Sequence, residues 1–120
     1  MRFTIKGRLD GLNEYTLANR NNRFGGAKMK ENNELLISAQ LPKVNTIEGK
    51  VFIVFHWFEP NSRRDPDNIA FAKKFILDAM VRRHILKGDS QRYIYGFHDM
   101  FSIDPENPRV EVIIREVRKQ

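Results

Sequence analysis

The stretch VFIVFHWFEPNSRRDPDN, residues 51–68, decides the fold, because an apolar run leads there directly into a charged turn. Residues 51–58 are almost all apolar or aromatic, which predicts a strand that is buried on both faces and central in its sheet. Residues 60–62, Pro-Asn-Ser, end this strand. Residues 63–68 are therefore expected at the carboxyl end of a central strand, where open sheets commonly place their functional sites.

Outward from this stretch, the chain alternates between strand and helix signals. Residues 67–86 carry apolar side chains at helical spacing, which predicts one long helix that Gly88 stops. The remaining patterns predict strands over 2–8, 92–101 and 110–117, a weak helix over 12–22 and a second helix over 27–41. The expected fold class is α+β, with a mixed sheet of about four strands packed with helices in a single domain over 1–120.

Composition narrows the classes of function. The 120 residues include 21 Lys and Arg against 15 Asp and Glu, a formal net charge of +6 that favours a polyanionic partner, most commonly nucleic acid. Cysteine is absent from the chain, which excludes disulfides, thiolate zinc sites and cysteine nucleophiles. The sequence shows no secretory signal, and its apolar runs are too short to span a bilayer. We therefore expect no membrane partner and a cytoplasmic, nucleoid-associated location, and an origin in a phage or prophage fits as well as a cellular one.

Asp65-Pro66-Asp67-Asn68 is the first candidate site. A residue before proline is biased toward extended backbone, and positions i and i+2 of an extended chain point the same way. Asp65 and Asp67 could then hold one Mg²⁺, which proteins bind through one or two carboxylates together with phosphate oxygens and water. Arg63 and Arg64, just upstream, could hold the phosphates. The alternative is that Asp65 caps a helix that begins at Pro66, with Asp67 complementing the helix dipole.

Other charged side chains allow two interpretations each. On a continuous helix, Lys74 lies on the same face as Asp67, about 10 Å along the axis, whereas Lys73 lies off that line. Asp89 follows Gly88 and is a candidate either for a turn or for a site. Arg20 and Arg23 belong to a basic cluster that either contacts DNA phosphates or forms a solvated face.

Taken together, three elements resemble the RusA-type Holliday junction resolvases. They are Asp65-Pro66-Asp67-Asn68, a helix in which a lysine precedes Leu77-Asp78-Ala79, and Asp89-Ser90-Gln91. The order of the expected strands around these elements is also similar, and the resemblance covers residues 50–117 best. It implies a RusA-like dimeric fold and a Mg²⁺-dependent endonuclease that acts on four-way DNA junctions.

The resemblance also assigns roles to particular residues. It implies that Asp65, Asp67 and Asp89 hold the metal, and it matches the catalytic lysine of the family best to Lys74. The spacing from Asp67 to this lysine is one helical turn longer than the family pattern, so that Lys73 stays a second candidate. The residues that we expect to contact DNA are Arg63, Arg64, Lys73, Arg20 and Arg23.

The expected geometry raises a question about the third carboxylate. A straight helix over 67–86 is about 30 Å long, so Asp67 and Asp89 of one chain could not bind the same ion. We therefore expect a homodimer with these helices antiparallel, in which each site combines Asp65 and Asp67 of one chain with Asp89 of the other. The expected function is a junction-resolving endonuclease of recombination and repair. The alternatives are a non-catalytic basic nucleic-acid-binding protein, or a nuclease of the same fold that cuts other branched DNA or RNA.

Overall fold

A four-stranded sheet forms around the apolar run, and the computed structural model describes residues 1–117 of the chain. The run becomes β2 (Val51–Glu59), which lies between β3 (Ile94–Ile103), its parallel neighbour, and β4 (Arg109–Glu116), which is antiparallel to it. The short β1 (Arg2–Lys6) pairs with the outer side of β4, which gives the order β1-β4-β2-β3. The mixed sheet of the predicted α+β fold and the central place of β2 are both confirmed.

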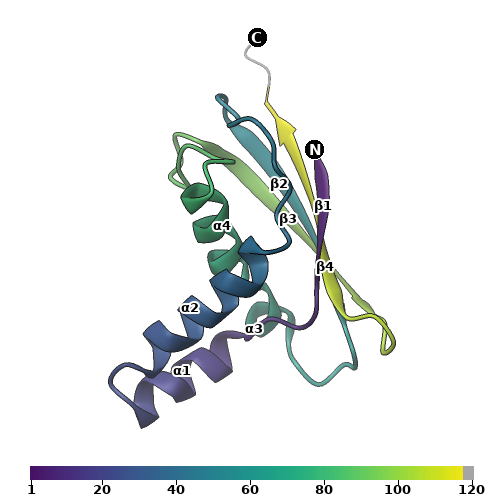
Figure 1. The fold of residues 1–120 in the computed structure, drawn as a ribbon. Coiled ribbons are helices and arrows are strands. Elements are labelled where there is room, and N and C mark those ends of the chain that lie inside the picture. The colour runs from purple at the N-terminus through teal and green to yellow at the C-terminus, as the bar shows by residue number, and fades with distance from the viewer. Residues whose placement is uncertain (118–120) are drawn as a thin grey trace.

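Helices cover only one face of this sheet, as Figure 1 shows. Alternate side chains of β2, beginning with Val51, are buried under the helices, while those between them are half-buried on the open face. The prediction that β2 is buried on both faces is therefore wrong. Within residues 1–117 no helix packs on its open side, where cross-strand neighbours shield the half-buried side chains in part.

The helical layer consists of α1 (Leu12–Asn21), α2 (Gly25–Ser38), α3 (Pro66–Ala70) and α4 (Lys73–Arg82). The buried side of α4 supplies the largest share of the core on this face, through Phe75, Ile76, Ala79 and Met80. Figure 1 shows α1 and α2 extending beyond the end of the sheet as a hairpin. Among the described residues, every helix is too short or too polar to cross a membrane.

The single helix predicted over 67–86 is wrong, because the chain breaks it between α3 and α4 at Phe71 and Ala72. The backbone tightens there: the N–H of Lys74 donates to the carbonyl of Phe71, three residues back, at 3.1 Å. No proline or glycine lies at the break, and aromatic side chains pack around it. Phe71 and Phe75 meet edge to face with centroids 5.7 Å apart, and both contact the ring of Tyr15 on α1.

The same segment also ends earlier than predicted, at Arg82 rather than near residue 86. His84 adopts the left-handed conformation with φ 61°, and the N–H of Ile85 donates to the carbonyl of Met80 at 2.9 Å, a common way for a helix to end. This turn directs Ile85 and Leu86 into the core, where both are buried. Ile85 and Leu86, whose spacing predicted a longer helix, are therefore core residues of an irregular segment.

The path of the chain separates the two ends of the sheet. It leaves the carboxyl end of β2 into α3, runs back along the sheet in α4, and enters β3 at the amino end of the sheet (Figure 1). Strands β2 and β3 are parallel over nine paired residues, a length of about 26 Å at about 3.3 Å per residue. Features before α3 and features before β3 therefore lie at opposite ends.

Candidate functional site

Asp65 stands at the point where the chain turns from the carboxyl end of β2 into α3. Its backbone is extended, with φ −72° and ψ 153°, and it occupies the position before Pro66, the first residue of α3. This is the geometry of a helix cap, but the side chain of Asp65 makes no capping hydrogen bond. The helix-start interpretation of this turn is therefore right for the backbone, and it leaves the Asp65 carboxylate unused.

The carboxylates of Asp65 and Asp67 are both free. Each residue is exposed, and within residues 1–117 neither side chain takes part in a hydrogen bond or an ion pair. Both lie at one tight turn of a chain with an excess of basic residues. Unpaired carboxylate oxygens are the ligands that a hard cation such as Mg²⁺ prefers. The turn can thus supply two such ligands, and the others would come from water and substrate.

Arg64, immediately before this turn, is buried rather than presented to solvent. Its side chain is 8% exposed, and its guanidinium donates two parallel hydrogen bonds of 2.8 Å to the carboxylate of Glu59, whose side chain is 9% exposed. A third donor reaches the carbonyl of Leu9 at 3.1 Å and Glu14 at 3.2 Å. The expectation that Arg64 contacts DNA phosphate does not fit this arrangement, because its donors already hold β2, α1 and the loop before α1 together.

Asn68, on the other side of the carboxylate pair, is buried as well. Its side-chain oxygen accepts a hydrogen bond of 2.8 Å from the backbone N–H of Asn13, at the start of α1. A Cβ at Gly11 would come within 2.6 Å of this oxygen, so the loop before α1 can approach α3 only because residue 11 is glycine. Anchored neighbours therefore hold the exposed Asp65 and Asp67 on a rigid support, with Arg63 exposed beside them.

The two candidate lysines differ in their surroundings. Lys73 is 17% exposed, and its ammonium donates to Asp99 on β3 at 2.6 Å while lying over the ring of Phe97. The other oxygen of Asp99 accepts from the indole N–H of Trp57 at 2.9 Å. Lys73 is thus part of a packed polar cluster, and this position does not fit the predicted contact with DNA.

Lys74 is 55% exposed and lies 3.8 Å from Asp78, one helical turn further on. The prediction that it shares a face with Asp67 assumed one continuous helix, and the break at Phe71 and Ala72 removes that basis. Its ammonium nevertheless stays accessible, unlike that of Lys73. Of the two lysines, Lys74 is the one whose charge reaches solvent.

Asp89 is exposed in the irregular segment that connects α4 to β3, at the other end of the sheet from Asp65 and Asp67. The described residues contain no group of three His, Cys, Asp or Glu side chains that could hold a metal ion. One copy of the chain therefore places Asp65 and Asp67 at the same turn and leaves the third predicted ligand at the other end of the sheet. The prediction that both carboxylates point the same way assumed extended backbone, whereas Asp67 lies in the first turn of α3.

A second ion-pair network lies at the same end of the sheet as the carboxylate pair. The N–H of Asp104, which follows β3, donates to the carbonyl of Glu59 at 2.8 Å. Arg109 donates to Asp104 at 2.8 Å and to Glu111 at 2.9 Å. The hydrogen bond from Arg109 holds the pKa of the Asp104 carboxyl below its ordinary value. This network fixes the β3–β4 connection.

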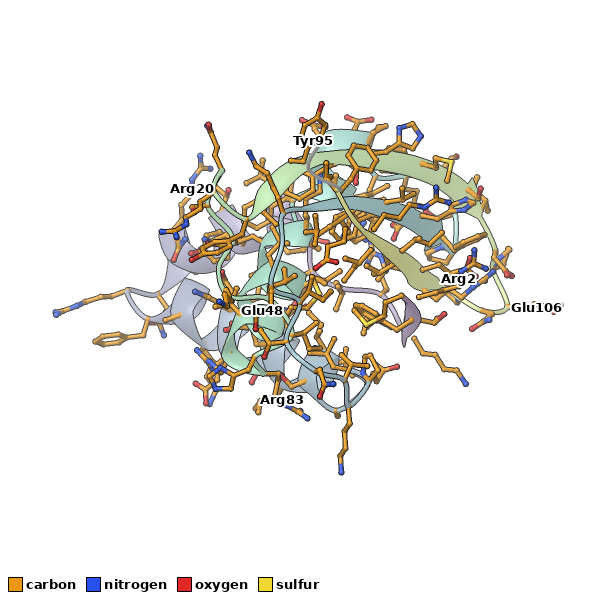
Figure 2. The ribbon with its side chains drawn as sticks, turned by 90° about the horizontal axis from the view of Figure 1, so that it is seen from above. Arg2, Arg20, Glu48, Arg83, Tyr95 and Glu106 are labelled. Carbon is orange, nitrogen blue, oxygen red and sulfur yellow. The ribbon has the colours of Figure 1, made fainter. Side chains whose placement is uncertain are left out.

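The predicted DNA contacts Arg20 and Arg23 lie elsewhere, at the connection between α1 and α2. Both are exposed, and Figure 2 shows Arg20 at the helical side of the molecule. Sequence reasoning missed Phe24 beside them, a large and exposed aromatic residue. The signal available in the sequence was its place between Arg23 and the Gly25-Gly26 pair.

No family model matches this chain, and no curated protein matches it either.

Proposed function

We propose that the protein is a divalent-metal-dependent endonuclease that cuts branched DNA, with four-way junctions as its preferred substrate. The observation that carries this proposal is the pair of free carboxylates, Asp65 and Asp67, on a turn whose neighbours Arg64 and Asn68 are buried and anchored. A purely structural role at the helix start would use Asp67 for the helix dipole but leave the Asp65 carboxylate without a hydrogen-bond partner. On a basic protein that binds DNA without a metal, both carboxylates would also repel phosphate.

Phosphodiester hydrolysis requires an activated water, compensation for the phosphate charge and a stabilised leaving oxygen. A bound Mg²⁺ supplies all three functions when present, and the oxygen donors of Asp65 and Asp67 fit it. The work of this chain is to hold these donors in place and to bring phosphate to them. Arg63 is exposed beside the turn and suits phosphate binding, and the accessible ammonium of Lys74, at the start of α4, is available to neutralise a phosphate of the bound substrate.

The third carboxylate enters through a second copy of the chain, and β3 is the edge that suits this contact. This strand pairs on one side only. The strand exposes five apolar residues, Tyr95, Phe97, Met100, Phe101 and Ile103. It is therefore unlike a protected edge, which usually carries lysine, proline or a bulge that turns it away. Its one acidic residue, Asp99, is already held by Lys73.

Antiparallel pairing of two β3 strands across a two-fold axis has a direct consequence for the site. The amino end of the partner strand would lie beside the carboxyl end of β3, the end at which Asp65 and Asp67 stand. Asp89 precedes β3 by a few residues, so the partner copy would bring its own Asp89 toward the pair. This arrangement replaces the antiparallel long helices expected from the sequence, because that helix is broken.

The test of the activity is cleavage of a labelled four-way junction, with a linear duplex of the same arm sequence as the comparison, in Mg²⁺ and in EDTA. We expect cleavage of the junction that requires Mg²⁺ and is lost in Asp67→Asn. Glu31→Gln, which removes an exposed charge on α2, is the matched control and should cut normally. Absence of metal-dependent cleavage by the wild-type protein, or full activity of Asp67→Asn, would reject the proposal.

Sharing of the site is tested by mixing Asp67→Asn chains with Asp89→Asn chains. If sites are shared, each heterodimer holds one complete site, and random mixing restores about a quarter of the wild-type sites. If each site comes from one chain, every site in the mixture is defective and no activity returns.

Ile103→Lys should separate the dimer through the charge that it places on the β3 edge, whereas Leu35→Lys, at another exposed apolar position, should not.

A further inference from the structure

The tip of the α1–α2 hairpin is a rigid structure rather than a loose connection. A Cβ at Gly25 would collide with the backbone oxygen of Ala18, and one at Gly26 would collide with the side chain of Asn19. The two helices can therefore approach this closely only because both positions are glycine. Asn22 closes the turn: its side-chain oxygen accepts from the N–H of Phe24 and its carbonyl from that of Gly25, both at 2.9 Å. The tip thus holds Phe24 in a fixed position.

The charge of this tip has a single sign. Residues 15–30 contain four basic residues and no Asp or Glu. Lys30 pairs with Asp78 on α4, but Arg20, Arg23 and Lys28 make no ion pair within residues 1–117. The positive end of the α2 dipole adds to the same field, since the helix begins at Gly25 without a side-chain cap. The tip therefore attracts a polyanion.

Phe24 gives this basic tip an aromatic surface. Its ring is 65% exposed even though the guanidinium of Arg23 lies 5.0 Å from its centroid. Figure 1 shows the α1–α2 connection at the end of the hairpin away from the sheet, so that this tip protrudes from the rest of the molecule. An exposed ring on a rigid basic protrusion has the features of a side chain that stacks on a base or enters a base step.

We propose that the α1–α2 tip binds DNA at a branch point, where Phe24 stacks on an unstacked base and Arg20, Arg23 and Lys28 contact the flanking phosphates. Charge favours this occupant over a second copy of the tip, which would bring like charges together. A branch point is favoured over continuous duplex as the binding site, because unstacked bases are available there at low cost. The proposal shares its DNA partner with the proposed endonuclease but uses none of its carboxylates.

The experiment measures binding in EDTA, so that cleavage plays no part. The probes are a labelled four-way junction, a duplex with one unpaired base and a continuous duplex, with 2-aminopurine beside the branch or the unpaired base to report stacking. Phe24→Ala should weaken binding to the first two probes about tenfold, the magnitude expected for one stacked base, and leave the continuous duplex unchanged. Phe24→Trp should retain affinity and a 2-aminopurine signal close to that of the wild type. Leu35→Ala, at an exposed apolar position further along α2, is the matched control.

Arg23→Gln tests the phosphate contacts separately. It should weaken binding to all three probes alike and reduce the slope of log affinity against log salt by about one. Equal losses on all probes for Phe24→Ala, or unchanged binding, would overturn the stacking role. So would a result in which Phe24→Ala abolishes binding to anionic phospholipid vesicles and leaves DNA binding intact. Tip-dependent binding without any metal-dependent cleavage would support this proposal and reject only the endonuclease.

Discussion

Replacement of Arg64 by alanine should be among the most damaging single changes in this protein. The side chain is buried and donates two parallel hydrogen bonds of 2.8 Å to Glu59, which is buried as well. Removal of one partner of such a pair leaves an uncompensated charge in the interior, which costs about 3–5 kcal/mol. Arg8 remains 3.5 Å from Glu59, so we expect the lower end of this range, about 3 kcal/mol.

Urea unfolding at neutral pH measures this loss. With a slope of about 1.5 kcal/mol per M, a loss of about 3 kcal/mol lowers the midpoint by about 2 M. Arg63→Ala is the matched control, because this adjacent arginine is exposed, and its effect should stay within about 0.5 kcal/mol.

A double-mutant cycle with Glu59→Gln and Arg64→Met separates the ion pair from the volume of the side chains. The double variant should be more stable than the sum of the single changes predicts, with a coupling energy of about 2 kcal/mol, because it removes both charges together. A loss below about 1 kcal/mol for Arg64→Ala, or additive single changes, would show that the pair does not hold this end of the sheet together.

Three further predictions concern the supports of the two proposed sites. Asp99→Ala leaves the ammonium of Lys73 and the indole N–H of Trp57 without their acceptor, so unfolding should require about 2 kcal/mol less. The emission of Trp57, the sole tryptophan, should shift, and an unchanged spectrum would contradict the contact. Gly25→Ala forces α1 and α2 apart at Ala18 and should lower stability by about 1–3 kcal/mol, whereas Lys28→Ala should have little effect in the same thermal unfolding assay. Arg109 lowers the pKa of Asp104 from 3.8, so the stability that this carboxylate contributes is complete above about pH 4 and is lost as the pH falls further. The stability difference between the wild type and Asp104→Asn should therefore shrink as the pH falls from about 4 to about 2, and a constant difference would refute the assignment.

The positions of the strands along the chain and the place of the carboxylate turn were readable from the sequence because both depend on local patterns. An apolar run such as residues 51–58 indicates a central strand whatever surrounds it, and Pro66 after Asp65 indicates a helix start. The break at Phe71 and Ala72 was not readable, because no proline or glycine causes it. It lies where Phe71 and Phe75 pack against the ring of Tyr15, a residue more than fifty positions earlier in the chain.

Long-range pairing also decided which charged residues are available to a ligand. Arg63 and Arg64 look equivalent in the sequence, yet only Arg64 lies within reach of Glu59, Glu14 and the carbonyl of Leu9. Lys73 and Lys74 differ in the same way, because Lys73, at the start of α4, forms an ion pair with Asp99 on β3. Adjacent residues with the same charge therefore took opposite roles, one in the framework and one at the surface, through partners that local patterns do not reveal.

The separation of Asp67 from Asp89 has a different cause from the one that the sequence suggested. A continuous helix of about 30 Å was expected to hold them apart, and that helix does not exist. The parallel pairing of β2 with β3 separates them instead, because the turn into α3 follows the carboxyl end of β2 and the segment with Asp89 precedes the amino end of β3. A crossover between parallel strands always returns the chain to the starting end of the sheet, so a bend in the connecting helix does not remove this separation. The topology of the sheet shows that Asp89 of the same chain cannot join Asp65 and Asp67, so in the proposed shared site it must come from a second copy, for which we propose the exposed apolar edge of β3 as the binding surface.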